Sequence, residues 1–216
     1  MSNFIIALDG PSGSGKSTIA NILAKKLKIS YLNTGSMYRA VTLFFLENNK
    51  KKSDKIDIDL LRKINIDIKG DKVFLNEKDV SEKIRNKEVT ENVSWVSSIF
   101  LVRKYLVDMQ RKISQNKSII LDGRDIGTVV FPNAKYKFFL VASSEVRAKR
   151  RYEQNEIDKS LEEIQKDIEK RDYLDSHREI SPLKKAEDAI EIDSSNLTID
   201  ETIEEIINKM DKEDVL

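Results

Sequence analysis

One eight-residue motif near the N-terminus constrains the fold of this chain more than any other feature. Residues 10–17 read GPSGSGKS and fit the pattern G-x-x-x-x-G-K-[ST]. An apolar run at residues 4–8 precedes the motif, and a stretch with helical periodicity follows it. A strand, a glycine-rich turn and a helix in this order form a phosphate-binding loop, because the turn amides point towards phosphate oxygens and the helix N-terminus favours negative charge.

The motif also assigns roles to individual side chains. We expect Lys16 to reach the β and γ phosphates of a nucleotide, and Ser17 to offer its hydroxyl to Mg²⁺. The helix that follows should turn one apolar face towards a sheet. That face is predicted to consist of Ile19, Ile22, Leu23 and Leu27. A flexible Gly/Ser turn at a helix cap is the alternative, and the flanking strand and helix argue against it.

Five short apolar segments are typical of buried strands, and longer segments with helical periodicity separate them. The expected strands are residues 4–8, 31–32, 119–121, 138–141 and 189–192. Strands that alternate with helices predict an α/β fold with a parallel sheet. Capping-box sequences at Ser160 with Glu163, and at Thr198 with Glu201, predict two helix starts.

Two segments break this alternation. Ile64, Ile66 and Ile68 recur at period two, Gly70 opens a turn, and residues 73–75 are apolar, so an inserted antiparallel hairpin is expected. Residues 147–179 are highly charged with few apolar positions, which suggests a mobile helical flap.

The composition excludes several other kinds of chemistry. The chain has 216 residues, a net charge of +1, no cysteine and one histidine, His177. Without cysteine there is no disulfide, thiol nucleophile or cysteine-ligated metal, and one histidine argues against a histidine zinc site. The balanced charge predicts no nucleic-acid or membrane partner, and the run at residues 4–8 is too short for a signal-peptide core. We therefore expect a cytoplasmic protein.

Two of the seven glycines lie in the segment DGRDIG at residues 122–127. Asp122 ends an apolar run there, and a carboxylate at a strand end can reach Mg²⁺ directly or through its waters. A role as a turn or helix-cap residue is the alternative for Asp122.

Four arginines are candidates for a second anion site: Arg39, Arg124, Arg171 and Arg178. Each of them alone is also compatible with an ordinary surface position. A phosphate acceptor would explain the lack of an obvious general base, because a phosphate oxygen is already an anionic nucleophile. Positioning and charge neutralisation then suffice for transfer.

A GTPase switch is the competing class, since a phosphate-binding loop indicates a nucleotide and not a reaction. Residues 67–70 match D-x-x-G and residues 208–211 match N-K-x-D. The first match falls in the predicted hairpin and the second in a segment with helical spacing, so both are interpreted as coincidence. A nucleotide-sensing module without chemistry would not need a second phosphate site.

With these segments together, the chain resembles the bacterial cytidylate (CMP/dCMP) kinases, which are nucleoside monophosphate kinases. The resemblance covers essentially the whole chain. It rests on IALDGPSGSGKST near the start, YLNTGSMYRA at 31–40, KDVSEKIRNKEV at 78–89, DGRDIGTVVFP at 122–132, KRDYLDSHREISPL at 170–183 and AEDAIEIDSS at 186–195.

The resemblance implies a three-layer P-loop fold in one domain, residues 1–216. Its parts would be a five-stranded parallel sheet, a small antiparallel sheet inserted at about 64–90 on the monophosphate side, and a helical lid at about 147–178. It implies transfer of the γ-phosphoryl group of ATP to CMP or dCMP, with Mg²⁺ and without a general base, by a monomer. A relative that uses UMP or another small acceptor is the nearest alternative.

The resemblance also implies a role for each residue that matches a family motif. The implied ATP-binding residues are Gly10, Pro11, Ser12, Gly13, Ser14, Gly15, Lys16, Ser17 and Thr18. The implied CMP-binding residues are Thr34, Tyr38, Arg39, Ser94, Arg103, Arg124, Asp125, Arg171, Asp175 and Arg178. The implied catalytic residues are Lys16, Arg124, Arg171 and Arg178, and the implied metal ligands are Ser17 and Asp122, directly or through water.

Within the CMP set, the contacts differ by substrate group. Thr34 and Arg39 would bind the acceptor phosphate, joined by Arg124 and Arg178 when the lid closes, with Tyr38 nearby. The implied readers of the cytosine edge are Ser94, Arg103 and Asp125, and Asp175 with Arg171 would contact the ribose. One departure is Asn33, which stands where the family commonly has Asp. Trp95 and His177 are interpreted as a packing residue and a lid-surface residue.

Overall fold

The computed structural model describes residues 3–154 and 159–215. The chain divides into two compact units, residues 1–31 with 114–216, and residues 32–113. Among the described residues, no helix is long and apolar enough to cross a membrane.

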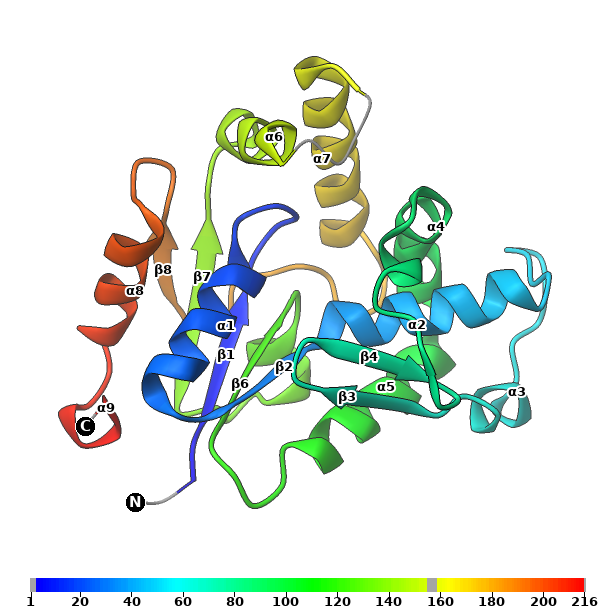
Figure 1. Cartoon of the computed structure of the whole chain (residues 1–216), viewed down its shortest axis with the longest axis horizontal. Helices are drawn as coiled ribbons and strands as arrows, with labels where there is room; N and C mark the ends of the chain where they lie inside the picture. The colour runs from blue at the N-terminus through cyan, green and yellow to red at the C-terminus, as the bar shows by residue number, and fades with distance from the viewer. Residues whose placement is uncertain (1–2, 155–158, 216) are drawn as a thin grey trace. The chain divides into compact units, whose positions relative to one another are not determined.

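A five-stranded parallel sheet organises the first unit, as predicted. Its strand order is β2-β6-β1-β7-β8, and β1 pairs in parallel with both β6 and β7 (Figure 1). The strands are β1 (Ile5–Asp9), β2 (Ser30–Asn33), β6 (Ile119–Gly123), β7 (Tyr136–Val141) and β8 (Ile190–Asp193). Each one overlaps an expected strand, and β1 and β6 each extend into a polar or glycine residue beyond the apolar run that predicted them.

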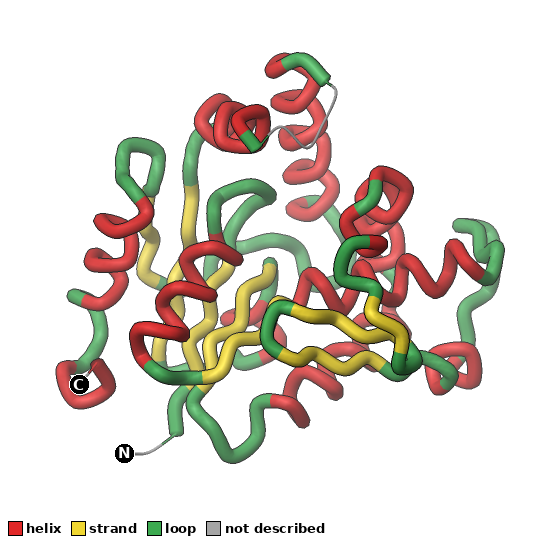
Figure 2. Tube along the Cα trace, in the orientation of Figure 1, coloured by secondary structure: helices red, strands yellow, loops and turns green. Residues whose placement is uncertain are grey.

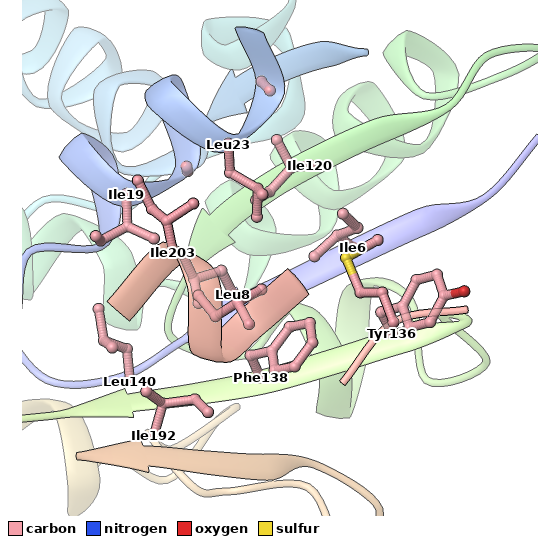
Figure 3. Packing of buried hydrophobic residues seen from close by; sticks show 14 of the residues in the cluster. Ile6, Leu8, Ile19, Leu23, Ile120, Tyr136, Phe138, Leu140, Ile192 and Ile203 are labelled. Carbon is pink, nitrogen blue, oxygen red and sulfur yellow. The ribbon is translucent and has the colours of Figure 1, made fainter. Parts of the chain in front are cut away.

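The core of this unit lies between the sheet and α1 and α8. Ile6 and Leu8 of β1 are fully buried and lie in one cluster with Leu23 and Phe138 (Figure 3). The helices of the unit are α1 (Lys16–Leu27), α6 (Ser144–Glu153), α7 (Leu161–Ser176), α8 (Ile199–Ile207) and α9 (Lys212–Val215). Helices α6 and α7 lie beyond the carboxyl ends of β1 and β7 (Figure 1).

The predicted apolar face of α1 is wrong at one residue. Ile22 is 37% exposed, whereas Ile19 and Leu23 are buried. Two small residues, Ala20 and Ala24, extend the buried face on its other side, and Ile22 falls beyond its edge because a helix turns once in about 3.6 residues. Counting only large apolar residues therefore misplaced the buried face of α1.

Helix starts in this unit follow their predicted signals. Ser160 caps α7 and Thr198 caps α8, each within a complete capping box. Residues 147–178, the expected lid, coincide with most of α6 and all of α7, and residues 155–158 of that range lie outside the described residues.

The second unit contains the inserted hairpin. Strand β3 (Ile66–Lys69) pairs antiparallel with β4 (Lys72–Leu75) around Gly70, and β4 pairs with the short β5 (Lys78–Asp79) (Figure 2). The hairpin prediction is confirmed, and the third strand makes the small antiparallel sheet that the resemblance implied. The helices of the unit are α2 (Thr34–Glu47), α3 (Ile58–Arg62), the 3-10 turn η1 (Lys83–Arg85), α4 (Lys87–Ser98) and α5 (Phe100–Ile113).

Candidate active site

The phosphate-binding loop joins β1 to α1 at the carboxyl end of the sheet. Gly10 has φ of +150°, and a Cβ there would lie 2.1 Å from the carbonyl oxygen of Leu140 in β7, so only glycine fits. Gly15 has φ of +91° and caps the N-terminus of α1. The loop therefore has the strand-turn-helix context that its motif requires.

Lys16 is buried inside this loop. Its Nζ donates to the carbonyl oxygen of Pro11 at 2.5 Å and to Oγ of Ser14 at 3.1 Å. Burial lowers the pKa of Lys16 well below its usual range, and the nearby cation of Arg124 lowers it further. A multiply charged anion beside Lys16 would stabilise its charged form.

Ser17 and Asp122 lie side by side at the mouth of the loop. Oγ of Ser17 donates to Oδ2 of Asp122 at 2.9 Å, and the hydroxyl of Tyr31 donates to Oδ1 at 2.9 Å. Burial raises the pKa of Asp122, while Lys16 and the two hydroxyl groups oppose that rise. A hydroxyl oxygen beside a carboxylate is a donor set that suits Mg²⁺, so the two residues fit the metal role expected of them.

A second buried carboxylate lies on the neighbouring strand, and the sequence analysis did not single it out. Asp9 ends β1 and is 4% exposed. Its Oδ1 accepts from the amide of Ile126 at 2.8 Å and its Oδ2 from the amide of Gly127 at 2.7 Å. Burial raises the pKa of Asp9 to about 7 against these two hydrogen bonds. A polar residue that closes an apolar strand just before a phosphate loop was the signal that could have revealed it.

Three of the four candidate arginines lie in the first unit: Arg124, Arg171 and Arg178. Arg124 Nε pairs with Oδ2 of Asp175 at 3.0 Å, and Arg178 lies 3.8 Å from Oδ1 of Asp125. Burial lowers the pKa of Arg171 to about 10, and the charge of Arg124 is the next largest cause. Nε of Arg171 is buried and has no hydrogen-bond partner among the described residues.

Arg124 thus stands near enough to repel both Lys16 and Arg171. A bound phosphate group would relieve this repulsion, because its negative charge attracts all three cations and its oxygens accept bidentate hydrogen bonds from arginine. Arg124 lies close enough to Arg171 for their charges to interact, and convergence of the four arginines on one anion stays a prediction.

Helices α6 and α7 reach the phosphate loop through two residues that the sequence analysis missed. Oδ1 of Asp172 accepts from the amide of Ser12 at 2.9 Å, and Oδ2 pairs with Arg147 at 2.5 Å. Arg147 also donates to the carbonyl oxygen of Ser12 at 2.7 Å and to that of Ala142 at 2.8 Å. In the sequence both residues belong to a charged stretch of similar residues, and no local spacing distinguishes them.

The remaining candidate residues belong to the second unit. Thr34 is buried at the start of α2, and Arg39 donates to the carbonyl oxygen of Ile84 at 3.0 Å and to Oγ1 of Thr90 at 2.9 Å. The guanidinium of Arg103 lies over the ring of Tyr38, 5.4 Å from its centroid.

Two hydrogen bonds in series link Arg103 to Ser94, with Ser97 between them. It donates to the carbonyl oxygen of Ser97 at 3.1 Å, and Oγ of Ser97 donates to the carbonyl oxygen of Ser94 at 3.0 Å. Tyr38, Ser94 and Arg103 are thus brought together within this unit. Their joint action with Arg124, Asp125 and Asp175 stays a prediction.

Three minor expectations have clear outcomes. Asn33 caps α2, because its side chain accepts from the amide of Ser36 at 2.8 Å, a bond that Asp would also make. Trp95 packs against Phe45 with ring centroids 6.2 Å apart, as expected of a packing residue. His177 is exposed and stacks on Tyr173, as expected of a surface residue.

The positions of the two GTPase-like matches are also settled. Asp67 and Gly70 belong to β3 and its turn, and Asn208 follows directly on α8 as its C-terminal cap. Neither match lies in a loop that follows a strand of the parallel sheet, so the interpretation as coincidence is confirmed.

Comparison with known proteins agrees with this arrangement. The family model described as Cytidylate kinase matches residues 6–212. The chain belongs to this family. A cytidylate kinase of Fusobacterium nucleatum subsp. nucleatum is 55% identical over 98% of this chain and 99% of its own length. One of Clostridium botulinum is 49% identical over 96% of this chain and 98% of its own.

The fold of this member of the cytidylate kinase family also resembles that of a solved structure with little sequence identity. A shikimate kinase from Acinetobacter baumannii in complex with shikimate matches with a TM-score of 0.50 at 14% identity, covering 97% of both chains. At that identity the likeness concerns the fold alone.

Proposed function

We propose that the chain transfers the γ-phosphoryl group of ATP to CMP or dCMP and releases ADP with CDP or dCDP. The observation that carries the proposal is the gathering of Lys16, Arg124 and Arg171 beside a phosphate-binding loop. Arg124 repels both Lys16 and Arg171 in the protein alone, which supports a site built for more than one phosphate.

On the donor side, residues 10–18 bind the phosphates of ATP through main-chain amides, and Lys16 binds the β and γ groups. Ser17 and Asp122 would hold Mg²⁺, directly or through water, and the ion would supply positive charge to offset that of the phosphates. Arg147 and Asp172 keep the first half of the loop in place at Ser12.

On the acceptor side, the phosphate of CMP supplies its own anionic nucleophile, so this chain needs no general base. Arg39, Arg124, Arg171 and Arg178 orient that phosphate in line with the γ-phosphoryl group and neutralise charge that develops in transfer. Thr34 and Tyr38 complete the phosphate contacts.

The base and sugar are read by polar groups. The cytosine edge offers an amino donor and ring acceptors, which Asp125, Ser94 and Arg103 complement, and Asp175 contacts the ribose. A base that leaves these buried groups unpaired is rejected strongly, because an unpaired buried polar group is unfavourable. Closure of the lid at about 147–178 excludes water that would otherwise hydrolyse ATP.

A coupled assay of ADP release tests this proposal with CMP, dCMP, UMP, AMP and shikimate as acceptors. We expect turnover with CMP and dCMP well above the others, and none without Mg²⁺. Turnover with UMP or shikimate alone would contradict the assignment of the acceptor. Tight GTP binding without any transfer would favour a switch. Action as a monomer in the cytoplasm, without nucleic-acid or membrane partners, stays a prediction to be checked by sizing and fractionation.

A further inference from the structure

The carboxylate of Asp9 accepts two hydrogen bonds from main-chain amides beside the candidate site. Its two oxygens accept one hydrogen bond each, from the amides of Ile126 and Gly127, at 2.8 and 2.7 Å. These amides begin η2 (Ile126–Val130), one turn of π-helix that follows directly on Arg124 and Asp125. The side chain of Asp9 therefore holds the segment that carries two acceptor-site residues.

The main chain of Asp9 belongs to the donor side. Asp9 is the last residue of β1, opposite Gly123 of β6 in the parallel register, and the phosphate loop begins at the next residue, Gly10. One residue thus joins the loop expected to bind ATP with the loop expected to bind the acceptor. The buried position leaves this link little freedom.

Gly127 is closely surrounded by the side chains of Asp9 and Lys137. A Cβ at Gly127 would lie 3.5 Å from Oδ2 of Asp9 and 3.2 Å from Cδ of Lys137. Lys137 holds the far end of the same loop, because its Nζ donates to the carbonyl oxygen of Pro132 and pairs with Asp188 at 2.6 Å. The loop is therefore fixed at its start by Asp9 and at its end by Lys137.

Only an ionised carboxylate satisfies both amides. It accepts two hydrogen bonds with two oxygens, whereas a carboxamide of the same shape offers one oxygen and turns an NH₂ group towards the second amide. We propose that Asp9 is a positioning residue that sets Arg124 and Asp125 relative to the phosphate loop, and so determines the affinity for the acceptor nucleotide. The inference rests on the proposed function, since it takes CMP as the acceptor.

The test is a kinetic comparison of Asp9→Asn with Asp122→Asn, two buried carboxylates at adjacent strand ends. For Asp9→Asn we expect KM for CMP to rise about tenfold or more, with KM for ATP changed by less than about twofold. For Asp122→Asn we expect the larger effect on the ATP and Mg²⁺ dependence. Asp59→Asn is the matched control, because Asp59 is exposed on α3 and should leave every constant unchanged.

Gly127→Ala disturbs the loop at the same place by another route, because the added methyl group would crowd Cδ of Lys137 at 3.2 Å, so a smaller rise in KM for CMP is expected than for Asp9→Asn. Amide hydrogen exchange provides a readout that does not depend on turnover: Asp9→Asn should lose protection at whichever of Ile126 and Gly127 faces the new NH₂ group, and retain it in β6. Equal changes in both KM values, or unchanged protection at these two amides, would overturn the inference. If the unmodified enzyme fails to phosphorylate CMP, the proposed function is wrong, and the exchange experiment still decides whether Asp9 fixes the loop.

Discussion

The strand ends of the sheet and helix α7 both supply charged residues to the candidate site, but they hold them differently. Asp9 and Asp122 lie at adjacent strand ends, and their oxygens accept from main-chain amides and hydroxyl groups. On α7, Asp175 pairs with Arg124, and Asp172 pairs with Arg147 and also accepts from the amide of Ser12. The contacts of Asp9 with two amides are therefore part of the fold itself.

The pair of Asp175 on α7 with Arg124 is of another kind, because arginine exchanges a carboxylate for a phosphate with similar geometry. A group such as Arg124 can leave Asp175 for a substrate phosphate without unpairing a main-chain amide. We infer that Asp9 lies in the fixed half of the site and that the pair of Arg124 with Asp175 lies in the half that responds to substrates. The following experiments test this division.

Removal of the buried ammonium should give the largest effect. Lys16→Ala should lower turnover by about 1,000-fold or more, because Lys16 acts on the transferring phosphates. The free energy of unfolding should stay the same or rise, since burial destabilises this charge in the folded state. Steady-state rates and thermal melting provide the measurements, with Lys25→Ala, exposed on α1, as the control. Turnover close to normal would contradict the role of Lys16.

Loss of Asp125, the carboxylate proposed to read the cytosine edge, should rank second. Asp125→Ala should raise KM for CMP by about 100-fold, because buried partners of the cytosine edge are left unpaired, while KM for ATP changes little. Initial rates with each substrate varied in turn measure the split. Asp59→Ala serves as the exposed control. Equal effects on the two substrates would place Asp125 outside the acceptor site.

A variant of α7 tests the contact between this helix and the phosphate loop. Asp172→Asn should weaken the contact with Ser12 and raise KM for ATP by about tenfold, with little change for CMP. Asp167→Asn is the control, since Asp167 lies exposed on the same helix and pairs with Lys159 at the surface. A larger effect on CMP than on ATP would mean that α7 does not act through the phosphate loop.

The smallest effect concerns pH and the fixed half. Burial raises the pKa of Asp9 from 3.8 to about 7, opposed by its two amide bonds and Lys16 and reinforced by Asp125. The folded protein therefore keeps this proton to higher pH than the unfolded chain, and the resulting stability is lost as pH rises towards and through 7. The loss between pH 6 and pH 8 should be about 1 kcal/mol.

Denaturant unfolding of the unmodified protein and of Asp9→Asn at both pH values isolates this contribution. The difference in unfolding free energy between the two should shift in favour of Asp9→Asn as pH rises. A difference that is independent of pH would show that Asp9 ionises normally.

Local patterns predicted most of the fold but fewer of the contacts within the site. The strands, the hairpin and both capping boxes depend on neighbouring residues, so period and turn chemistry were sufficient. Ile22 was misplaced because small alanines also form part of a buried face. Asp9 and Asp172 were missed because each acts on a main-chain amide more than 100 positions away in the sequence. Such contacts depend on which strand ends and helices become neighbours in the fold. The spacing of residues within one segment carries no information about those neighbours.

The packing of Trp95 against Phe45 has a practical consequence. The chain contains one tryptophan, and it lies in the unit of residues 32–113. Intrinsic tryptophan fluorescence is therefore a built-in optical reporter of that unit alone, whereas circular dichroism follows both. Comparing the two signals in one titration would show whether the parts of this enzyme melt in concert or one after the other.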